Sequence, residues 1–191
     1  MSKYEPKLYS YELNKEMMAE LAEEFDVEAL ATNFAKAVDG KSGDEAAAEA
    51  ESFFADYGTR WIRKSQKLGE EYPDRTYEVL LEAIDSTDGY MRFALVPQRF
   101  LEIAYLATQD FPHLKIIENN QYRLIYRLKQ CKTYEQLKDK CGDEIADSLP
   151  CRHACTTACE VVHRDLEVDA KVEMQAEMPK DGYCQFAAIR A

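Results

Sequence analysis

The sequence predicts an α+β fold in which a helical N-terminal half packs on an antiparallel sheet with a C-terminal helix and β-hairpin. Apolar residues in the first half recur at helical spacing, whereas several segments of the second half alternate with a period of two. Helices come first and strands mixed with helices follow, which favours an antiparallel sheet. We expect one domain over 1–191, with a mainly helical half at 1–88 and a half at 89–191 that contains the strands and all six cysteines.

The first half is expected to form four helices, each with an apolar stripe. Asp26 suits the N-cap of the second helix, and Ser42 with Glu45 suits a capping box for the third. Pro73 precedes the fourth helix, and a turn-forming cluster at 85–89 follows it. The expected helices cover residues 13–25, 26–40, 42–69 and 74–84.

The second half begins with segments of mixed period. Residues 90–96 alternate and predict a strand, and the proline that follows suits the first turn of a short helix over 97–108. Two further alternating segments flank the asparagine pair at 119–120, which predicts a hairpin over 114–128. A helix is expected over 133–140.

The C-terminal segment predicts one more helix and a closing hairpin. Ser148 suits the N-cap of a helix that runs to about Arg164. Residues 167–178 and 183–189 alternate strictly, and the Lys-Asp-Gly sequence at 180–182 predicts the turn between them.

Charge excludes some classes of function. The net charge is -12 at pH 7 and the pI is about 4.8. Such a surface repels phosphate backbones and anionic lipids, so we expect neither nucleic acid nor a membrane as partner. The first residues lack the apolar region of a signal peptide, so we expect a cytoplasmic protein with reduced thiols. A small molecule is the expected partner, and a homodimer is compatible with this charge.

Three cysteines follow the spacing C-x3-C-x3-C, which places Cys151, Cys155 and Cys159 on one helical face. A straight stripe of thiols cannot surround an iron–sulfur cluster, and a buried free cysteine commonly packs as a small apolar residue. Cys151 differs because it is expected in the first turn, where unpaired N–H groups lower a thiol pKa. A reactive thiol and a packed thiol both remain open for Cys151.

Two other residues are candidates for catalysis beside Cys151. Cys131 stands at a strand-to-helix junction, a position where side chains often line a pocket. His113 lies in a loop and is free to approach a thiol. His153 is a poor partner for Cys151, because residues two apart on a helix do not face each other.

A zinc site is the second kind of chemistry that the cysteines suggest. Glu173 and Cys184 are neighbours across the expected closing hairpin. Together with Cys151 they would give sulfur and oxygen ligands of the types that zinc accepts, with water as a fourth ligand. The alternative for Glu173 is an ordinary exposed position on a strand.

The last third of the chain resembles a known family. The segments 126–137 (YRLKQCKTYEQL), 149–151 (LPC) and 181–186 (DGYCQF) resemble three cysteine-containing elements of L-2-amino-thiazoline-4-carboxylic acid hydrolase-like proteins. The resemblance implies a hydrolase that acts on a carbon–nitrogen bond of a small cyclic or amide-like substrate. Cys151 would then be the nucleophile or a metal ligand, and the cysteines of the other two segments would line the site.

The same region is also similar to 4-vinyl reductase-type ligand-binding domains, which occur in sensors of small aromatic compounds. That similarity implies a binding module rather than an enzyme, with a structural zinc held by Cys151, Glu173 and Cys184. Pockets of this kind are mainly apolar. The residues expected to line such a pocket are Phe93, Tyr105, Tyr126 and Phe186, which could equally fill the core.

Overall fold

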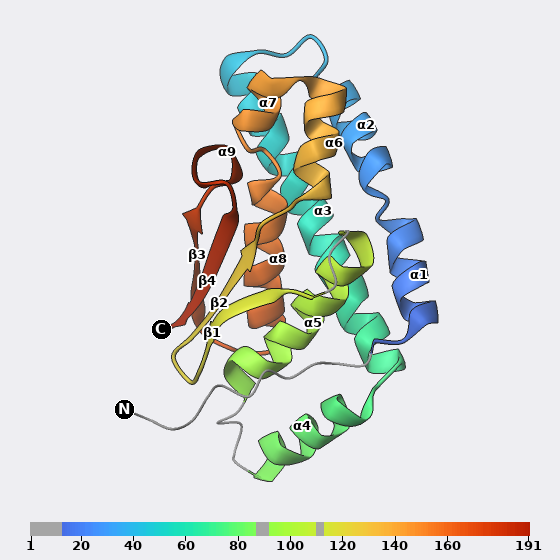
Figure 1. Cartoon of the computed structure of the whole chain (residues 1–191), viewed down its shortest axis with the longest axis vertical. Helices are drawn as coiled ribbons and strands as arrows, with labels where there is room; N and C mark the ends of the chain where they lie inside the picture. The colour runs from blue at the N-terminus through green and yellow to red at the C-terminus, as the bar shows by residue number, and fades with distance from the viewer. Residues whose placement is uncertain (1–12, 87–91, 110–112) are drawn as a thin grey trace.

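The computed structural model describes residues 13–86, 92–109 and 113–191, with the side chains of residues 92–94 outside the description. In this part of the chain, helices pack on one side of a four-stranded antiparallel sheet (Figure 1). The predicted α+β class, with a helical N-terminal half and C-terminal strands, is confirmed.

The first half forms helices where the sequence predicted them. The side chains of Asn14 and Asp26 accept hydrogen bonds from first-turn N–H groups and so cap the first two helices. Ser42 stands at the N-cap of the third helix, but its side chain makes no cap hydrogen bond, so the predicted capping box is not formed. These helices are α1 (Lys15–Glu24), α2 (Val27–Val38), α3 (Gly43–Glu71) and α4 (Arg75–Ser86).

The prediction of a strand over 90–96 is wrong, because its described residues belong to helix α5 (Arg92–Thr108). Pro97 lies inside this helix near its start, where its missing N–H costs a single helical bond. Val96 and Phe100 lie one turn apart and are both buried. A short apolar run can match both periods, and the longer helical stripe decides the structure here.

The sheet has the order β1-β2-β4-β3, and every neighbouring pair is antiparallel. The predicted hairpin around 119–120 is confirmed, and Asn120 Oδ1 closes its turn by accepting hydrogen bonds from Tyr122 N (2.8 Å) and Arg123 N (3.1 Å). The strands are β1 (Lys115–Asn119), β2 (Arg123–Leu128), β3 (Ala170–Ala176) and β4 (Cys184–Arg190).

The closing hairpin of β3 and β4 is also confirmed. Its connection contains a short helix, α9 (Met178–Asp181), which Gly182 ends in the left-handed conformation at φ 75°. The pairing register shifts between Met174 and Ala176. One face of β4 carries Cys184, Phe186 and Ala188, all buried.

Helices α6 (Lys132–Cys141) and α8 (Arg152–Asp165) appear close to their predicted bounds, and the short helix α7 (Asp143–Asp147) was not predicted. Ser148 ends α7 instead of capping α8, and Cys151 takes the N-cap position of α8. The reason is that the chain makes an extra turn at 148–151, with Leu149 at a positive φ of 56°.

Helix α8 lies between the sheet and α3 (Figure 1). It packs most extensively against α3, and the two backbones touch at Gly58, where an added Cβ would lie 2.3 Å from the carbonyl oxygen of Ala154. Only glycine permits this approach. Among the described residues, no helix has a stretch that is both long and apolar enough to span a bilayer.

Candidate functional site

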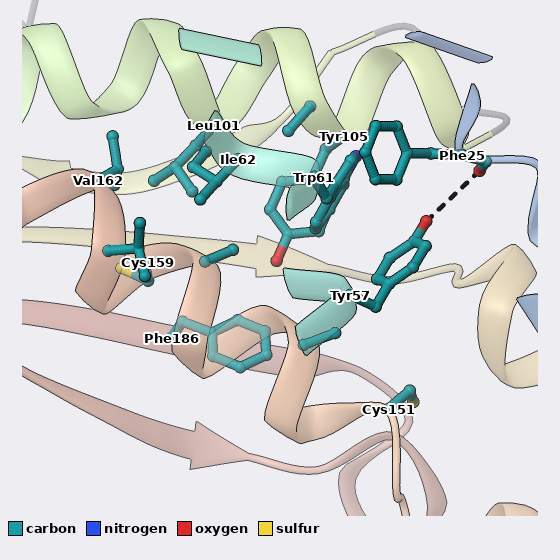
Figure 2. Packing of buried hydrophobic residues seen from close by; sticks show 14 of the residues in the cluster. Phe25, Tyr57, Trp61, Ile62, Leu101, Tyr105, Cys151, Cys159, Val162 and Phe186 are labelled. Carbon is teal, nitrogen blue, oxygen red and sulfur yellow. Dashed lines mark hydrogen bonds between the residues drawn. The ribbon is translucent and has the colours of Figure 1, made fainter. Parts of the chain in front are cut away.

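A narrow cavity lies where the starts of α6 and α8 meet α3 and the end of α5. The cavity has about 340 Å³ of empty space when its open mouth is included. Only about 20 Å³ of this is open to the centre of a water-sized molecule. The inner part therefore has room for about one or two water molecules. Figure 2 shows part of its wall, with Tyr57, Trp61 and Tyr105 on one side and Cys151 at the start of α8. The lining residues, all uncharged types apart from the thiols, are Leu30, Tyr57, Trp61, Tyr105, Gln109, Cys131, Thr133, Cys151, Ala154 and Cys155.

Cys131 is the N-cap residue of α6, with an extended backbone. Its thiol makes no side-chain cap hydrogen bond. The Cys151 thiol, the N–H groups of Tyr134 and Thr133 and the Thr133 hydroxyl nevertheless lie close enough to act on it as donors. Together they outweigh burial and hold the pKa of the Cys131 thiol below its usual range.

Gln109, directly after α5, fixes the start of α6. Its Oε1 accepts a hydrogen bond from Lys132 N at 2.9 Å, and its Nε2 donates to Thr133 Oγ1 at 3.2 Å. Since the Thr133 oxygen accepts this bond, its own hydrogen can point at Cys131 Sγ. The residue that follows one helix thus orients the hydroxyl that faces a thiol at the start of another.

Cys151 has the opposite setting, although its place at the start of α8 was expected to lower the pKa of its thiol. The N–H groups of Arg152, His153 and Ala154 already bond to backbone carbonyl oxygens of residues 149–151. The side chain of Cys151 makes no cap hydrogen bond. Its interaction with Cys131 and its burial raise the pKa of the Cys151 thiol well above the usual range. Of the two thiols, Cys131 is therefore the one that loses its proton more readily.

The other thiols near this end of the sheet stay protonated. Burial raises the pKa of Cys155, which lines the cavity, and raises the pKa of Cys159 to about 12. Cys184 begins β4 opposite Leu128 on β2, and burial with the nearby Cys131 raises its pKa to about 12. Cys131, Cys151 and Cys184 thus lie near enough to influence one another, but Cys184 is not part of the cavity wall.

An aromatic wall faces the sulfurs. Tyr57 and Trp61 lie one turn apart on α3, and the Tyr57 hydroxyl donates a hydrogen bond to the carbonyl oxygen of Phe25 at 3.4 Å. Tyr105 packs edge-on against Trp61, with ring centroids 4.9 Å apart. Neither Trp61 Nε1 nor Tyr105 Oη makes a hydrogen bond of ordinary geometry, although the Tyr105 hydroxyl lies near Cys155 and Tyr126 and burial raises its pKa.

Of the residues expected to bind a ligand, Tyr105 lines the cavity. Tyr126 and Phe186 instead stack on each other in the core, with centroids 5.4 Å apart. The side chain of Phe93 falls outside the described residues. His113, a catalytic candidate, is exposed just before β1 and is not part of the cavity wall.

The ligand set expected for zinc is not brought together. Glu173 pairs with Ala187, so it points to the face of the sheet opposite the one that carries Cys184. Its carboxylate accepts a hydrogen bond from Gln175 at 2.9 Å. Among the described residues, no group of three or more His, Cys, Asp or Glu side chains is arranged to hold a metal ion.

Several residues of the cavity were missed by sequence reasoning. The helical spacing of Tyr57 and Trp61 indicated a buried face, but nothing in the pattern indicated what that face would meet. Thr133, two residues after Cys131, carried a usable signal, because a hydroxyl in the first turn of a helix commonly bonds near the cap. Gln109 carried no such signal.

Comparisons with protein-family models, with curated proteins and with solved structures return no match.

Proposed function

We propose that this chain is a thiol-dependent hydrolase that cleaves a carbon–nitrogen bond of a small cyclic or amide-like substrate, with Cys131 as the nucleophile. The observation that carries the proposal is the pairing of two unlike thiols in one cavity. Donors at the start of α6 favour the charged form of Cys131, and Cys151 beside it keeps its proton. A nucleophile next to a proton donor is the arrangement that covalent catalysis requires.

The reaction follows from the two protonation states. Cys131 Sγ attacks the carbon of the carbon–nitrogen bond, and the bond breaks with its electron pair on nitrogen. The nitrogen takes the proton of Cys151, which leaves a thioester or thioimidate on Cys131 and a thiolate on Cys151. Water then attacks this intermediate while its proton passes to Cys151, and Cys131 leaves as the thiolate.

The cavity supports a small substrate. Its space of about 340 Å³ with the mouth included is of the size that a small ligand takes, its inner part has room for water, and its wall on the α3 side is aromatic. Aromatic side chains favour the faces of planar, weakly polar rings. The resemblance of the segments around Cys131 and Cys151 to L-2-amino-thiazoline-4-carboxylic acid hydrolase-like proteins points to the same class of reaction.

The test uses the full chain and three matched serine variants. The probes are small cyclic amidines, thiazolines and lactams, and ring opening is followed by mass spectrometry. We expect Cys131→Ser to lower turnover by roughly a thousandfold or more, Cys151→Ser to lower it less, and Cys141→Ser, outside the cavity, to leave it unchanged. Turnover that survives in Cys131→Ser would refute Cys131 as the nucleophile.

A second candidate function is the binding of a small apolar or aromatic ligand without catalysis. The aromatic wall and the lack of Asp, Glu, Lys, Arg and His side chains in the lining favour it. Native mass spectrometry of the purified chain, with Trp61→Ala as the comparison, distinguishes the two. A ligand that the parent chain retains unaltered and the variant loses would favour binding over hydrolysis.

A further inference from the structure

We infer that Cys131 and Cys151 form a peroxide-sensitive thiol pair, in which a hydroperoxide oxidises Cys131 and Cys151 closes a disulfide with it. This inference deepens the proposed function, because it assigns a regulation to the same thiolate. It rests on that proposal only in needing Cys131 to be ionised. It requires three properties of the site, which are a thiolate, access for a small oxidant and a second thiol within reach.

The first property is the setting of Cys131 at the start of α6. The N–H groups of Thr133 and Tyr134 and the hydroxyl of Thr133 face its sulfur. These donors stabilise the sulfur anion, so the thiolate is more readily formed for attack. Cysteines that react with peroxide are those with thiolate character and access to solvent.

The second property is the size of the cavity. The sulfurs of Cys131 and Cys151 belong to side chains that are 8% and 5% exposed, and they are reached through the narrow cavity. Space for about one or two water molecules admits hydrogen peroxide, which is little larger than water. A bulky disulfide such as oxidised glutathione does not fit that space. The cavity therefore selects a small hydroperoxide as the oxidant.

The third property is the position of Cys151. Cys131 and Cys151 line the same cavity from the N-cap positions of α6 and α8, and Cys151 is the thiol near enough to act on the charge of Cys131 as a donor. Cys155 also lines the cavity, but it lies nearer the Tyr105 hydroxyl. Cys184 acts on the pair only through charge. The geometry thus favours Cys151 over Cys155 and Cys184 as the resolving thiol.

The chemistry balances in two steps. The Cys131 thiolate attacks one oxygen of hydrogen peroxide, which leaves Cys131 as a sulfenic acid and releases hydroxide. The Cys151 thiol then attacks the sulfenic sulfur, and a disulfide forms as hydroxide leaves and takes the thiol proton to give water. Peroxide is reduced by two electrons, which the two thiols supply. A thiol reductant reverses the change.

The experiment follows the reduced full chain after brief exposure to a few equivalents of hydrogen peroxide. Free thiols are then trapped with N-ethylmaleimide, and the cross-link is located by peptide mapping. We expect a reductant-sensitive loss of two hydrogens per chain, mapped to Cys131 and Cys151. Cys151→Ser should instead accumulate sulfenic acid on Cys131 that dimedone traps once the chain is unfolded, and Cys131→Ser should oxidise at least tenfold more slowly. Cys141→Ser, outside the cavity, should behave as the parent, and Cys155→Ser should still form the cross-link between Cys131 and Cys151.

Two results would overturn the inference. One is a cross-link between any other pair, and the other is unchanged labelling of Cys131 and Cys151 after peroxide. Thermal unfolding of each variant shows that a lost cross-link is not a lost fold. Iodoacetamide labelling of Cys131 without peroxide separates the two proposals. Fast labelling at neutral pH without a cross-link would refute the pair and leave the nucleophile, whereas a cross-link without turnover on any probe would refute the hydrolase alone.

Discussion

Helix α5 contributes to two buried polar regions that differ in how their groups are partnered. Near its middle, Arg99 pairs with Asp74 and donates to the carbonyl oxygen of Gly69 at 3.3 Å. Nearby, Gln98 Nε2 donates to the carboxylate of Glu102 at 2.9 Å. At its C-terminal end, Tyr105 and the following Gln109 face the sulfur cavity.

The difference in partners indicates that the two regions have different roles. The polar groups of the first region hold α5 to the residues before α4, and Asn119 joins β1 to them through Gln98. In the second region, Trp61 Nε1 and Tyr105 Oη are buried without a hydrogen bond of ordinary geometry. Leaving such a group unpartnered costs about 1–3 kcal/mol, so the fold is stabilised by the first region and tolerates a cost in the second. Such a contrast is expected between a region that holds the fold together, here called the scaffold, and a functional site.

The largest expected effect is on stability, from Arg99→Met. Arg99 is fully buried, its guanidinium lies 4.5 Å from the ring centre of Tyr77, and its loss leaves Asp74 without its partner. We expect the free energy of unfolding to fall by roughly 3–5 kcal/mol, measured by urea denaturation. Cys131→Ser should change it by less than about 1 kcal/mol. Equal losses in the two variants would break the distinction between scaffold and site.

An intermediate effect is expected from Glu102→Gln. Burial raises the pKa of Glu102 to about 7, so the folded chain holds a proton that the unfolded chain has released above about pH 4.5. Its contribution to stability is therefore complete below pH 4.5 and lost as pH rises through 7, by on the order of 3 kcal/mol in total. The Glu102→Gln variant should not show this fall in the free energy of unfolding. Because burial lowers the pKa of His163, which acts with the opposite sign, the comparison with the parent chain isolates Glu102.

The smallest expected effect is from Thr133→Val. Removal of the hydroxyl that faces Cys131 raises the pKa of that thiol, and iodoacetamide labelling of Cys131 at neutral pH should slow by roughly threefold to tenfold. The free energy of unfolding should fall by about 1 kcal/mol, because Gln109 Nε2 loses its buried acceptor. Thr59→Val is the matched control, since the Thr59 hydroxyl bonds to Ala55 O within its own helix at 2.9 Å. If both variants label at the parent rate, the hydroxyl has no role in the site.

Local patterns predicted much of the fold. Helical stripes identified α1 to α4, and turn residues identified both hairpins, because those signals lie within a few residues of each other. The segment 90–96 was misread because a short run before a proline fits either period. The start of α8 was misplaced because a positive φ at Leu149 moved the cap to Cys151.

The site was predicted in part. Cys131 and Cys151 were recognised at element boundaries, and the structure places both in one cavity. Which of the two thiols ionises more readily could not be read from the sequence, because it depends on which N–H groups the chain leaves available. At Cys151 backbone carbonyls occupy them, and at Cys131 they do not. The aromatic wall comes from residues more than 20 positions away, which no local pattern can connect to the cysteines.

The contact between Gly58 and Ala154 also sets the width of the cavity. Gly58 lies between Tyr57 and Trp61 on α3, and Ala154 lies between Cys151 and Cys155 near the start of α8, so one backbone contact spaces the aromatic wall from the sulfurs. A methyl group at Gly58 would meet Ala154 O at 2.3 Å, and ordinary contact needs at least 3.4 Å. The helices would have to separate by about an ångström to accept it. Selection for thicker or thinner reactants can therefore act on residue 58, from outside the cavity and without altering a single group that performs the chemistry.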